Sequence, residues 1–352
     1  MILVAWVIGG HALLGYSAIG GWPYDEINEV TFHPGVETVL AAVIGPSGLF
    51  FMGVFYFMAG LLTPDSVRRK GPKRFALERS VRLGLPWAAS ALLVWPFFLW
   101  VAYRGAGRDV SFWWVLTHRD PLLDSGSLWF VLVLLIFSVG YAALTFRKTD
   151  GTTLLARRHV VRVTVLVALT TFAVRLVFPA RSGQIGDLHL WWWPQCLGMF
   201  ALGIAGGRRL AERIPDDVYR LCRTIVVFVI LLLPVAAAAL GVLDLADDAG
   251  PFLGGFRWQA MLLAVIEGVL VVAGSLWMVG FAQRRLRKPV PAAVNRGAFV
   301  AFVVQGPILL LIATAVRPLA APAEVKAPLV GALAIVLSFG IGWLVTRRRA
   351  RA

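Results

Sequence analysis

Residues 258–281, WQAMLLAVIEGVLVVAGSLWMVGF, decide the fold, because this run of 24 residues contains a single charged side chain, Glu267. As an α-helix it is about 36 Å long at about 1.5 Å per residue, enough to cross a hydrocarbon core about 30 Å thick. Similar apolar runs recur along the whole chain, which is 59% hydrophobic and 15% charged. An ordinary globular chain has about 45–50% apolar and about 25% charged residues. The sequence therefore predicts an all-α polytopic membrane protein.

We predict a bundle of about ten transmembrane helices in one integral-membrane domain, 1–352, with a tail at 347–352. The predicted spans are 1–16, 48–63, 83–103, 127–146, 160–179, 187–206, 224–243, 256–281, 297–316 and 327–346. The first span is short for the hydrocarbon core, and we favour a start upstream of Met1 over a tilted helix. Before the second span, PGVETVLAAVIGPSG predicts a short helix on or in the outer face.

The basic residues follow the alternation of these spans. Of the 34 Lys and Arg, 26 fall in the tail and in four alternate connections, 64–82, 147–162, 207–223 and 282–296. Short loops rich in Lys and Arg stay on the cytoplasmic side of a membrane. The net charge of +15 is therefore a topology signal that places both termini inside, and it does not indicate a nucleic-acid partner. The usage of Ala, Val, Arg and Gly is typical of a GC-rich bacterial genome, so we predict a multi-pass protein of the bacterial inner (cell) membrane.

The two cysteines, Cys196 and Cys222, are too few and too differently placed for a disulfide framework. We interpret both as small buried hydrophobic residues. No combination of residues has the spacing of metal ligands, so we predict no metal site.

Three ionisable residues lie within predicted spans: His11, Arg175 and Glu267. Such groups are costly in lipid and are functional candidates by default. By residue count, His11 and Glu267 lie near the middle of the membrane, whereas the long stem of Arg175 could reach the outer interface. The alternative is a buried polar cluster that ties helices together. A neutral imidazole suits general-base chemistry near pH 7, which favours a catalytic role for His11.

A second candidate lies where the chain enters the third span, in RFALERSVRLGLPW. Arg79 and Arg82 are three residues apart, on one face of a helix. Two adjacent guanidinium groups match a phosphate or pyrophosphate. We interpret the preceding Arg68, Arg69 and Lys70 as topology anchors.

Two further motifs carry weaker signals. The WWW at 191–193 favours an aromatic belt at the membrane interface over a stacking platform for sugar. The glycines of GMFALGIAGG (198–207) favour close helix packing.

Taken in order, these residues resemble the integral-membrane acyltransferases of acyltransferase family 3. His11 lies in the first span, as the His of the family does, and FFMGVFYFMAGLL (50–62) resembles its Phe-rich second span. Arg79 and Arg82 are similar to its Arg-x-x-Arg entry to the third span. GSLWFVLVLL (126–135) and WWWPQCLGMFALGIAGGRR resemble its fourth and sixth spans. The resemblance covers nearly the whole chain.

This resemblance implies transfer of an acyl group, often acetyl, from cytoplasmic acyl-CoA to a hydroxyl of a sugar, glycan or small metabolite. Acyl-CoA is then a donor substrate, and no permanently bound cofactor is expected. His11 is the expected general base, and Glu267 is expected to orient its imidazole or to offset its charge. Arg79 and Arg82 are expected to bind the CoA phosphates. For the substrate we expect contacts from Arg175, Gln305 and Trp129.

The chain departs from the pattern of the family at two places. Family members often read Tyr-x-x-His-x-Pro near the ninth span, where this chain has AFVVQGPILL with Gln305 in place of His. Gln forms hydrogen bonds but takes up no proton, so this branch is expected to handle its acceptor differently. The usual Arg about eleven residues before the His would precede Met1.

Two other functions stay open at this point. One is a proton-coupled secondary transporter in which His11, Arg175 and Glu267 form a relay. The absence of detectable similarity between the two halves counts against it, since transporters commonly contain internal repeats. The other is a catalytically inactive membrane scaffold.

Overall fold

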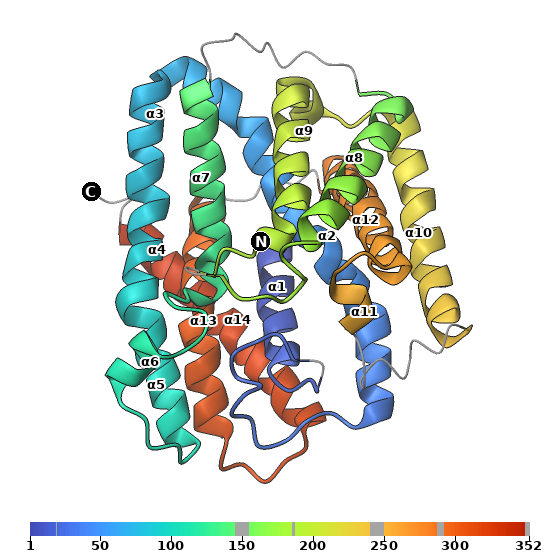
Figure 1. Ribbon diagram of the computed structural model, residues 1–352. Coiled ribbons are helices and arrows are strands. Elements are labelled where there is room, and N and C mark those ends of the chain that lie inside the picture. Colours follow the sequence, from blue (N-terminus) through green and yellow to red (C-terminus); the bar gives the residue numbers. More distant parts are fainter. Residues whose placement is uncertain (19, 145–154, 185–186, 240–249, 287–291, 349–352) are drawn as a thin grey trace.

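A computed structural model describes the chain except for residues 19, 145–154, 185–186, 240–249, 287–291 and 349–352. Within the described ranges the regular structure is entirely helical, as predicted (Figure 1). The helices are α1 (Ile2–Leu14), α2 (Pro34–Lys70), α3 (Pro72–Arg79), α4 (Leu85–Ala89), α5 (Trp95–Gly105), α6 (Phe112–Thr117), α7 (Trp129–Leu144), α8 (Arg157–Arg175), α9 (Trp193–Glu212), α10 (Asp216–Ala239), α11 (Gly250–Leu253), α12 (Trp258–Arg285), α13 (Ala292–Val316) and α14 (Ala323–Arg348).

Six helical segments are long and apolar enough to cross a membrane. They are Gly45–Lys70, Pro72–Gly105, Gly126–Leu144, Trp258–Arg285, Gly297–Val316 and Ala323–Arg347. Helix α1 is apolar but shorter, in keeping with the short first span predicted. Each of the ten predicted spans overlaps a helix, but α8, α9 and α10 are not among the six. The chain is therefore an all-helical protein with six candidate spans in its described part, and the count of ten stays a prediction.

Helix α2 is 37 residues long, or about 55 Å, and thus exceeds the thickness of the hydrocarbon core. It begins with Pro34 at its first position, after His33, whose side chain accepts a hydrogen bond from the Gly35 amide. It ends at Gly71, where φ is +80°. The segment predicted as a separate outer helix is instead the first part of α2, because Gly45 and Pro46 do not end the helix.

The third predicted span is interrupted by two turns of π-helix, Ser80–Gly84 and Ser90–Val94, which separate α3, α4 and α5. Such turns insert a residue into an α-helix and are frequent at functional sites. The first of them contains Arg82.

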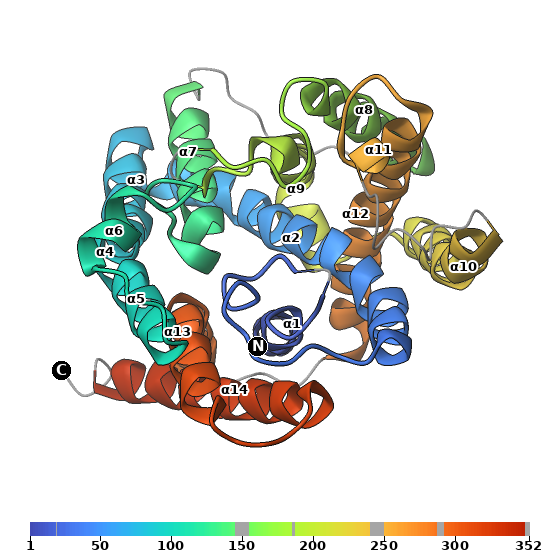
Figure 2. The ribbon, with the colours of Figure 1, turned by 60° about the horizontal axis from the view of Figure 1, so that its bottom comes forward.

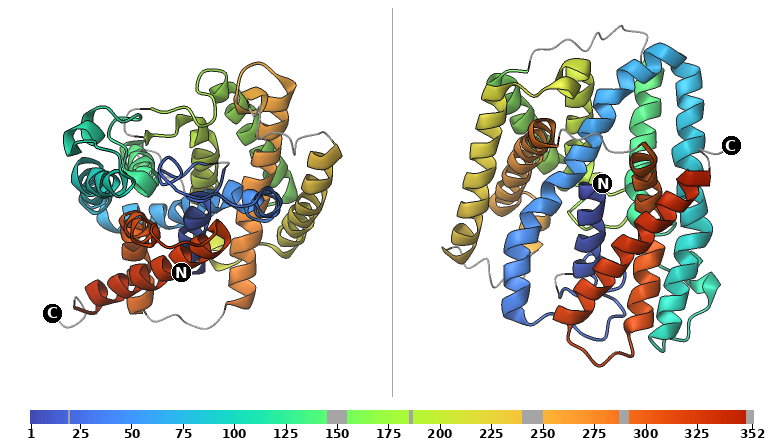
Figure 3. Two further views of the ribbon diagram at one scale, coloured as in Figure 1. Left: turned by 90° about the horizontal axis from the view of Figure 1, so that it is seen from below. Right: turned by 180° about the vertical axis from the view of Figure 1, so that it is seen from behind.

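Helix α1 lies in the middle of the bundle when the molecule is seen from near one end (Figure 2). It contacts α14, α13 and α2, and α10 lies at the periphery beside α12. Seen from behind, α14 crosses the bundle diagonally (Figure 3). The junctions α2–α3 and α9–α10 lie at the upper end in Figure 1, and the α1–α2 and α13–α14 connections lie at the lower end. The predicted alternation of basic and acidic connections requires this grouping.

Glycines allow two pairs of helices to approach very closely. A Cβ atom on Gly60 of α2 would lie 2.2 Å from the Phe200 carbonyl oxygen, and one on Gly203 of α9 would lie 2.3 Å from that of Phe57. Helices α13 and α14 meet in the same way at Gly297 and Gly342. Close packing through small residues is typical of membrane helices. The prediction of close packing for the 198–207 motif is confirmed at Gly203.

Candidate active site

His11 lies in the last turn of α1 and is half-buried. The helix that carries it is apolar throughout, and Val4, Ile8 and Ala12 are buried in the core. On its other side α14 packs so closely that a Cβ atom on Gly331 would lie 3.3 Å from Ala12 Cβ. The imidazole is therefore held inside the bundle, at the end of α1 where the α1–α2 loop begins.

Two side chains fix the imidazole. Its Nδ1 lies 3.3 Å from Gln305 Oε1 of α13. The ring stacks on Trp22 with the centroids 4.4 Å apart and the planes 15° from parallel. The structure thus brings together two residues that the sequence predicted, His11 and Gln305, and adds Trp22.

Trp22 reaches the imidazole because the α1–α2 loop folds back over the end of α1. The Phe32 amide donates to the Tyr16 carbonyl at 3.1 Å, and Asn28 Nδ2 donates to the Gly15 carbonyl at 3.0 Å. The Tyr24 hydroxyl donates to Glu29 at 3.0 Å. These bonds close the loop against α1 and bury Trp22, which is 5% exposed.

Trp95 of α5 packs against Trp22. The rings meet edge to face with centroids 5.6 Å apart, and Trp95 Nε1 donates to Asp124 Oδ2 at 2.8 Å. Arg119 forms ion pairs with Asp124 and with Glu26 of the α1–α2 loop. Glu26 therefore belongs to a network that braces the site. Trp22, Trp95 and this network were missed from the sequence, because a loop tryptophan that follows a helix with a histidine is too weak a pattern to predict their contact.

Arg79 and Arg82 have aromatic rather than acidic neighbours. The Arg79 guanidinium lies 5.2 Å from the ring centroid of Phe75, and that of Arg82 lies 5.7 Å from Phe299 of α13. Neither has an ion-pair partner among the described residues. Both charges are thus free to bind an anion.

Helix α13 connects the arginine pair to the imidazole. It carries Phe299 beside Arg82 and Gln305 beside His11. These positions are six residues apart, which corresponds to about 9 Å along the helix axis. Phe302 lies between them and packs against Phe55 and Phe130. One helix therefore contacts both predicted functional groups, at positions less than two turns apart along its axis.

Arg175 and Glu267 form a separate cluster. Arg175 Nη2 of α8 lies 2.7 Å from Glu267 Oε2 of α12, and their side chains are 1% and 6% exposed. Gln195 Nε2 of α9 donates to the same carboxylate oxygen at 2.9 Å. None of the described contacts of Glu267 involves His11, and Arg175 is buried rather than extended toward the interface. The alternative of a buried polar cluster that joins helices fits both residues.

Two tryptophans of the 191–193 motif belong to one aromatic stack. Trp191 and Trp192 are 4.8 Å apart and nearly parallel, and Trp192 stacks on Trp129 at 5.4 Å. The Arg175 guanidinium, which pairs with Glu267, lies 5.4 Å from the ring centroid of Trp191. Trp191 and Trp192 thus contact other aromatic rings, and the predicted interface belt stays a prediction. Trp129 is likewise a member of this stack.

Beside the tryptophan stack lies a pair of titratable groups that the sequence did not reveal, Asp187 and His189. His189 lies 4.5 Å from Trp129, ring to ring, and its Nδ1 lies 3.4 Å from Asp187 Oδ1. Both residues have positive φ, 52° and 47°, a strained conformation that often occurs at functional sites. Burial, and then the Asp124 carboxylate, raise the pKa of Asp187 to about 8, although Arg119 opposes the shift.

This raised pKa predicts a loss of stability as the pH rises from about 4 to about 8. The folded protein keeps the proton on Asp187 up to about pH 8, whereas the unfolded chain releases it near pH 3.9. The folded state binds more protons in this range, so stability falls with increasing pH. We expect Asp187→Asn to flatten the decrease of the unfolding temperature in detergent. Asp109→Asn, at a side chain that is 92% exposed, is the control and should behave as the wild type; equal slopes for all three proteins would contradict the prediction.

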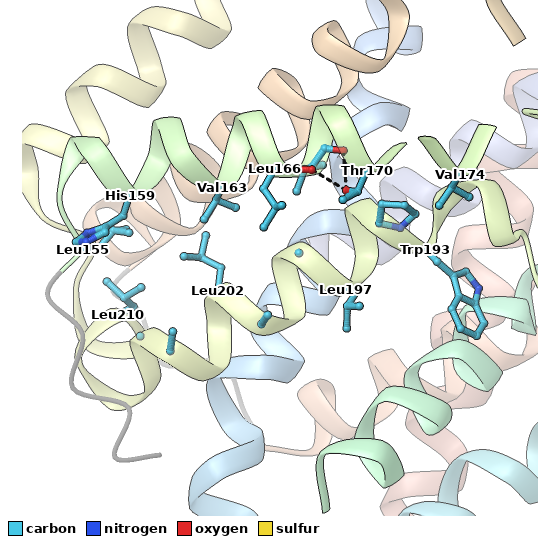
Figure 4. A pocket seen from close by; sticks show the side chains of 16 residues that line it. Leu155, His159, Val163, Leu166, Thr170, Val174, Trp193, Leu197, Leu202 and Leu210 are labelled. Carbon is cyan, nitrogen blue, oxygen red and sulfur yellow. Dashed lines mark hydrogen bonds between the residues drawn. The ribbon is translucent and has the colours of Figure 1, made fainter. Parts of the chain in front are cut away.

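A cavity of about 690 Å³ lies between α8 and α9, lined by apolar side chains such as Leu166, Val167 and Leu197 (Figure 4). His159 lies at one end of it and Trp193 at the other. Neither His11 nor the arginine pair lines it.

The described residues contain no group of three or more His, Cys, Asp or Glu that could hold a metal ion. Both cysteines are free and buried, as their interpretation as small hydrophobic residues requires.

Comparison with protein families places this geometry in context. A family model described as an acyltransferase domain, that of acyltransferase family 3, matches residues 1–347. The chain belongs to acyltransferase family 3. The match covers the helices that carry His11, the arginine pair, Gln305 and the Arg175–Glu267 cluster, so the resemblance seen in the sequence is confirmed. No curated protein and no solved structure matches the chain.

Membership of acyltransferase family 3 supports membrane acyltransferase activity. Together with the six apolar helices, it also supports an integral membrane protein.

Proposed function

We propose that this member of acyltransferase family 3 transfers an acyl group, by default acetyl, from acyl-CoA to a hydroxyl group of a carbohydrate or small metabolite. The observation that carries the proposal is that one helix, α13, contacts both groups: Gln305 lies beside the imidazole of His11, and Phe299 lies beside Arg82, which like Arg79 has no ion-pair partner among the described residues. The end of the bundle that carries the basic connections faces the cytoplasm. The donor therefore enters from the side of Arg79 and Arg82.

His11 acts as the general base in this proposal. The oxygen of Gln305 accepts a hydrogen bond and cannot donate one, so the Nδ1 atom that faces it carries the proton. Nε2 then presents a lone pair to the acceptor hydroxyl. As the hydroxyl oxygen attacks the thioester carbonyl carbon, Nε2 takes its proton. When the C–S bond breaks, His11 returns that proton to the CoA sulfur, so no oxidant or reductant is needed.

Arg79 and Arg82 bind the phosphates of CoA in this proposal, and the pantetheine arm follows α13 toward His11. On α13, Phe302 lies between Phe299 and Gln305 and packs against Phe55 and Phe130. Their apolar surface suits a thioester chain and excludes water, the competing acceptor.

The proposed function is tested with the purified protein in lipid nanodiscs and acetyl-CoA. We expect release of the CoA thiol, and formation of an acetyl ester by mass spectrometry when glycerol or a mixture of monosaccharides serves as the acceptor. Failure of acetyl-CoA to bind, together with solute uptake into proteoliposomes in its absence, would instead support the transporter. Saturable binding without turnover would leave only an inactive scaffold.

If Arg79 and Arg82 bind the phosphates of CoA, replacing either should weaken acetyl-CoA binding. Hydrogen bonds to charged groups contribute about 1.5–3 kcal/mol each, and about 1.4 kcal/mol corresponds to a tenfold change in Kd. Arg79→Gln and Arg82→Gln should therefore each weaken acetyl-CoA binding at least about tenfold, as measured by isothermal titration calorimetry.

Two controls make this prediction specific to phosphate recognition. Arg69→Gln, at a predicted topology anchor, should bind acetyl-CoA as the wild type does. S-acetylpantetheine, which lacks the phosphates, should bind equally to the wild type and to both arginine variants. An equal loss of affinity for the two donors would show that the arginines act through the fold and would refute phosphate binding.

A further inference from the structure

The amide nitrogen of Gln305 is a buried donor with no acceptor among the described protein atoms. The Gln305 side chain is 0% exposed, and its oxygen is the atom that faces His11. Nine in ten or more of such buried groups have a partner, and an unpaired one costs about 1–3 kcal/mol. A donor kept in this state beside a candidate general base indicates that its partner comes from a substrate.

The position of this donor follows from the geometry of the amide. The amide group is planar, so the contact between Oε1 and His11 Nδ1 also sets the direction in which the two N–H bonds of Nε2 point. Trp22 covers one face of the imidazole. A carbonyl oxygen bound beside the imidazole, within hydrogen-bond distance of Gln305 Nε2, would supply the acceptor that this donor lacks.

We propose that Gln305 Nε2 donates a hydrogen bond to the carbonyl oxygen of the acyl thioester and stabilises the charge that forms there. This inference rests on the proposed function. When the acceptor oxygen forms its bond to the carbonyl carbon, the π electrons move to the carbonyl oxygen, which becomes an oxyanion. When the C–S bond breaks, the electron pair returns and the carbonyl forms again. Gln305 thus has two functions, since its oxygen orients His11 and its nitrogen stabilises the oxyanion.

A glutamine side chain can perform both functions. The side chain of glutamine is neutral, and its planar amide contains both an acceptor oxygen and a donor nitrogen. Side-chain amides are known oxyanion donors, and the loss of one donor costs about 10²–10³ in kcat. Gly306, the next residue on α13, has no side chain because a Cβ atom there would lie 2.9 Å from the Trp95 ring. This close contact with Trp95 holds α13, and so Gln305, in place beside His11.

Gln305→Glu separates the two functions of the amide. A glutamate retains oxygens that accept from His11 Nδ1 but has no N–H group. We expect its kcat for CoA release from acetyl-CoA to fall about 10²–10³-fold, with an unchanged Kd for acetyl-CoA. If Gln305 only orients the imidazole, the glutamate should serve at least as well, and wild-type turnover of this variant would overturn the inference.

Gln305→Met provides a second measurement in case the buried glutamate prevents folding. Methionine is neutral and similar in size, and it has no N–H donor. We expect the carbonyl stretch of bound, carbonyl-labelled acetyl-CoA to shift to lower wavenumber in the wild type and to lose this shift in the Met variant, as measured by isotope-edited infrared spectroscopy. The same stretch in both proteins would also overturn the inference.

The failure of this inference is distinct from that of the proposed function. An inactive His11→Ala variant together with a fully active Gln305→Glu variant would remove the oxyanion role and leave the general base in place. An active His11→Ala variant would remove both.

Discussion

Replacing His11 with alanine is expected to lower acyl transfer from acetyl-CoA by about 10²–10⁴-fold, the usual contribution of a general base. The imidazole is held by Gln305 and Trp22, and alanine leaves the acceptor hydroxyl without a group to take its proton. The effect should fall on kcat, because Arg79 and Arg82, which bind the donor in our proposal, are unchanged. Turnover is measured as release of CoA in nanodiscs.

The matched control is His118→Ala, at an exposed histidine beside Thr117, which should retain full activity. The His11 variant must also bind acetyl-CoA and unfold at the wild-type temperature. If a folded His11→Ala protein turned over at the wild-type rate, the general base would have to be sought elsewhere.

Glu267→Gln is expected to destabilise the protein by about 3–5 kcal/mol, the cost of removing one partner from a buried ion pair. Arg175 is 1% exposed, so its charge would remain in an apolar interior with no carboxylate beside it. The variant should show a marked fall in unfolding temperature, measured by the accessibility of the two buried cysteines to a thiol-reactive dye.

The double variant Arg175→Met/Glu267→Gln distinguishes a structural from a catalytic role. Both charges are absent from it, so it should be more stable than Glu267→Gln alone, because a buried pair is often replaced by uncharged residues at little cost. The glutamine can still accept the hydrogen bond from Gln195. If the cluster only joins helices, the double variant should keep its CoA release. A loss of turnover in a stable double variant would restore the role beside His11 that the sequence predicted for Glu267.

The sequence predicted the helical class and most helix positions because lipid imposes a simple rule: long apolar runs must be helical. It also selected His11 and Arg175, since ionisable groups stand out in such runs. It failed to identify their partners. Residue count gives the depth of a side chain along its helix but not the neighbour it faces, so Glu267 was assigned to His11 when its partner is Arg175.

The sequence also failed to predict the contacts of residues in loops. Trp22 lies in a short polar segment, GGWPYDE, and only the fold brings it onto the imidazole. A tryptophan between glycines and a proline, one loop after an embedded histidine, was the available signal. For Asp187 and His189 the sequence carried no such signal, because their strained backbone and their closeness to Asp124 arise only in three dimensions. By contrast, Gln305 was found from a motif, and the structure adds what the motif lacked, namely the contact with His11.

The glycine contacts between helices also bear on how substrates travel. At Gly60 and Gly203 the backbones of α2 and α9 touch directly, as do those of α13 and α14 at Gly297 and Gly342. Alternating-access carriers rock one half of the molecule against the other, which requires an interface that can slide. Helix backbones in direct contact at these glycines resist such sliding. The close contacts therefore favour a scaffold that keeps one arrangement of its helices over a carrier that alternates between two.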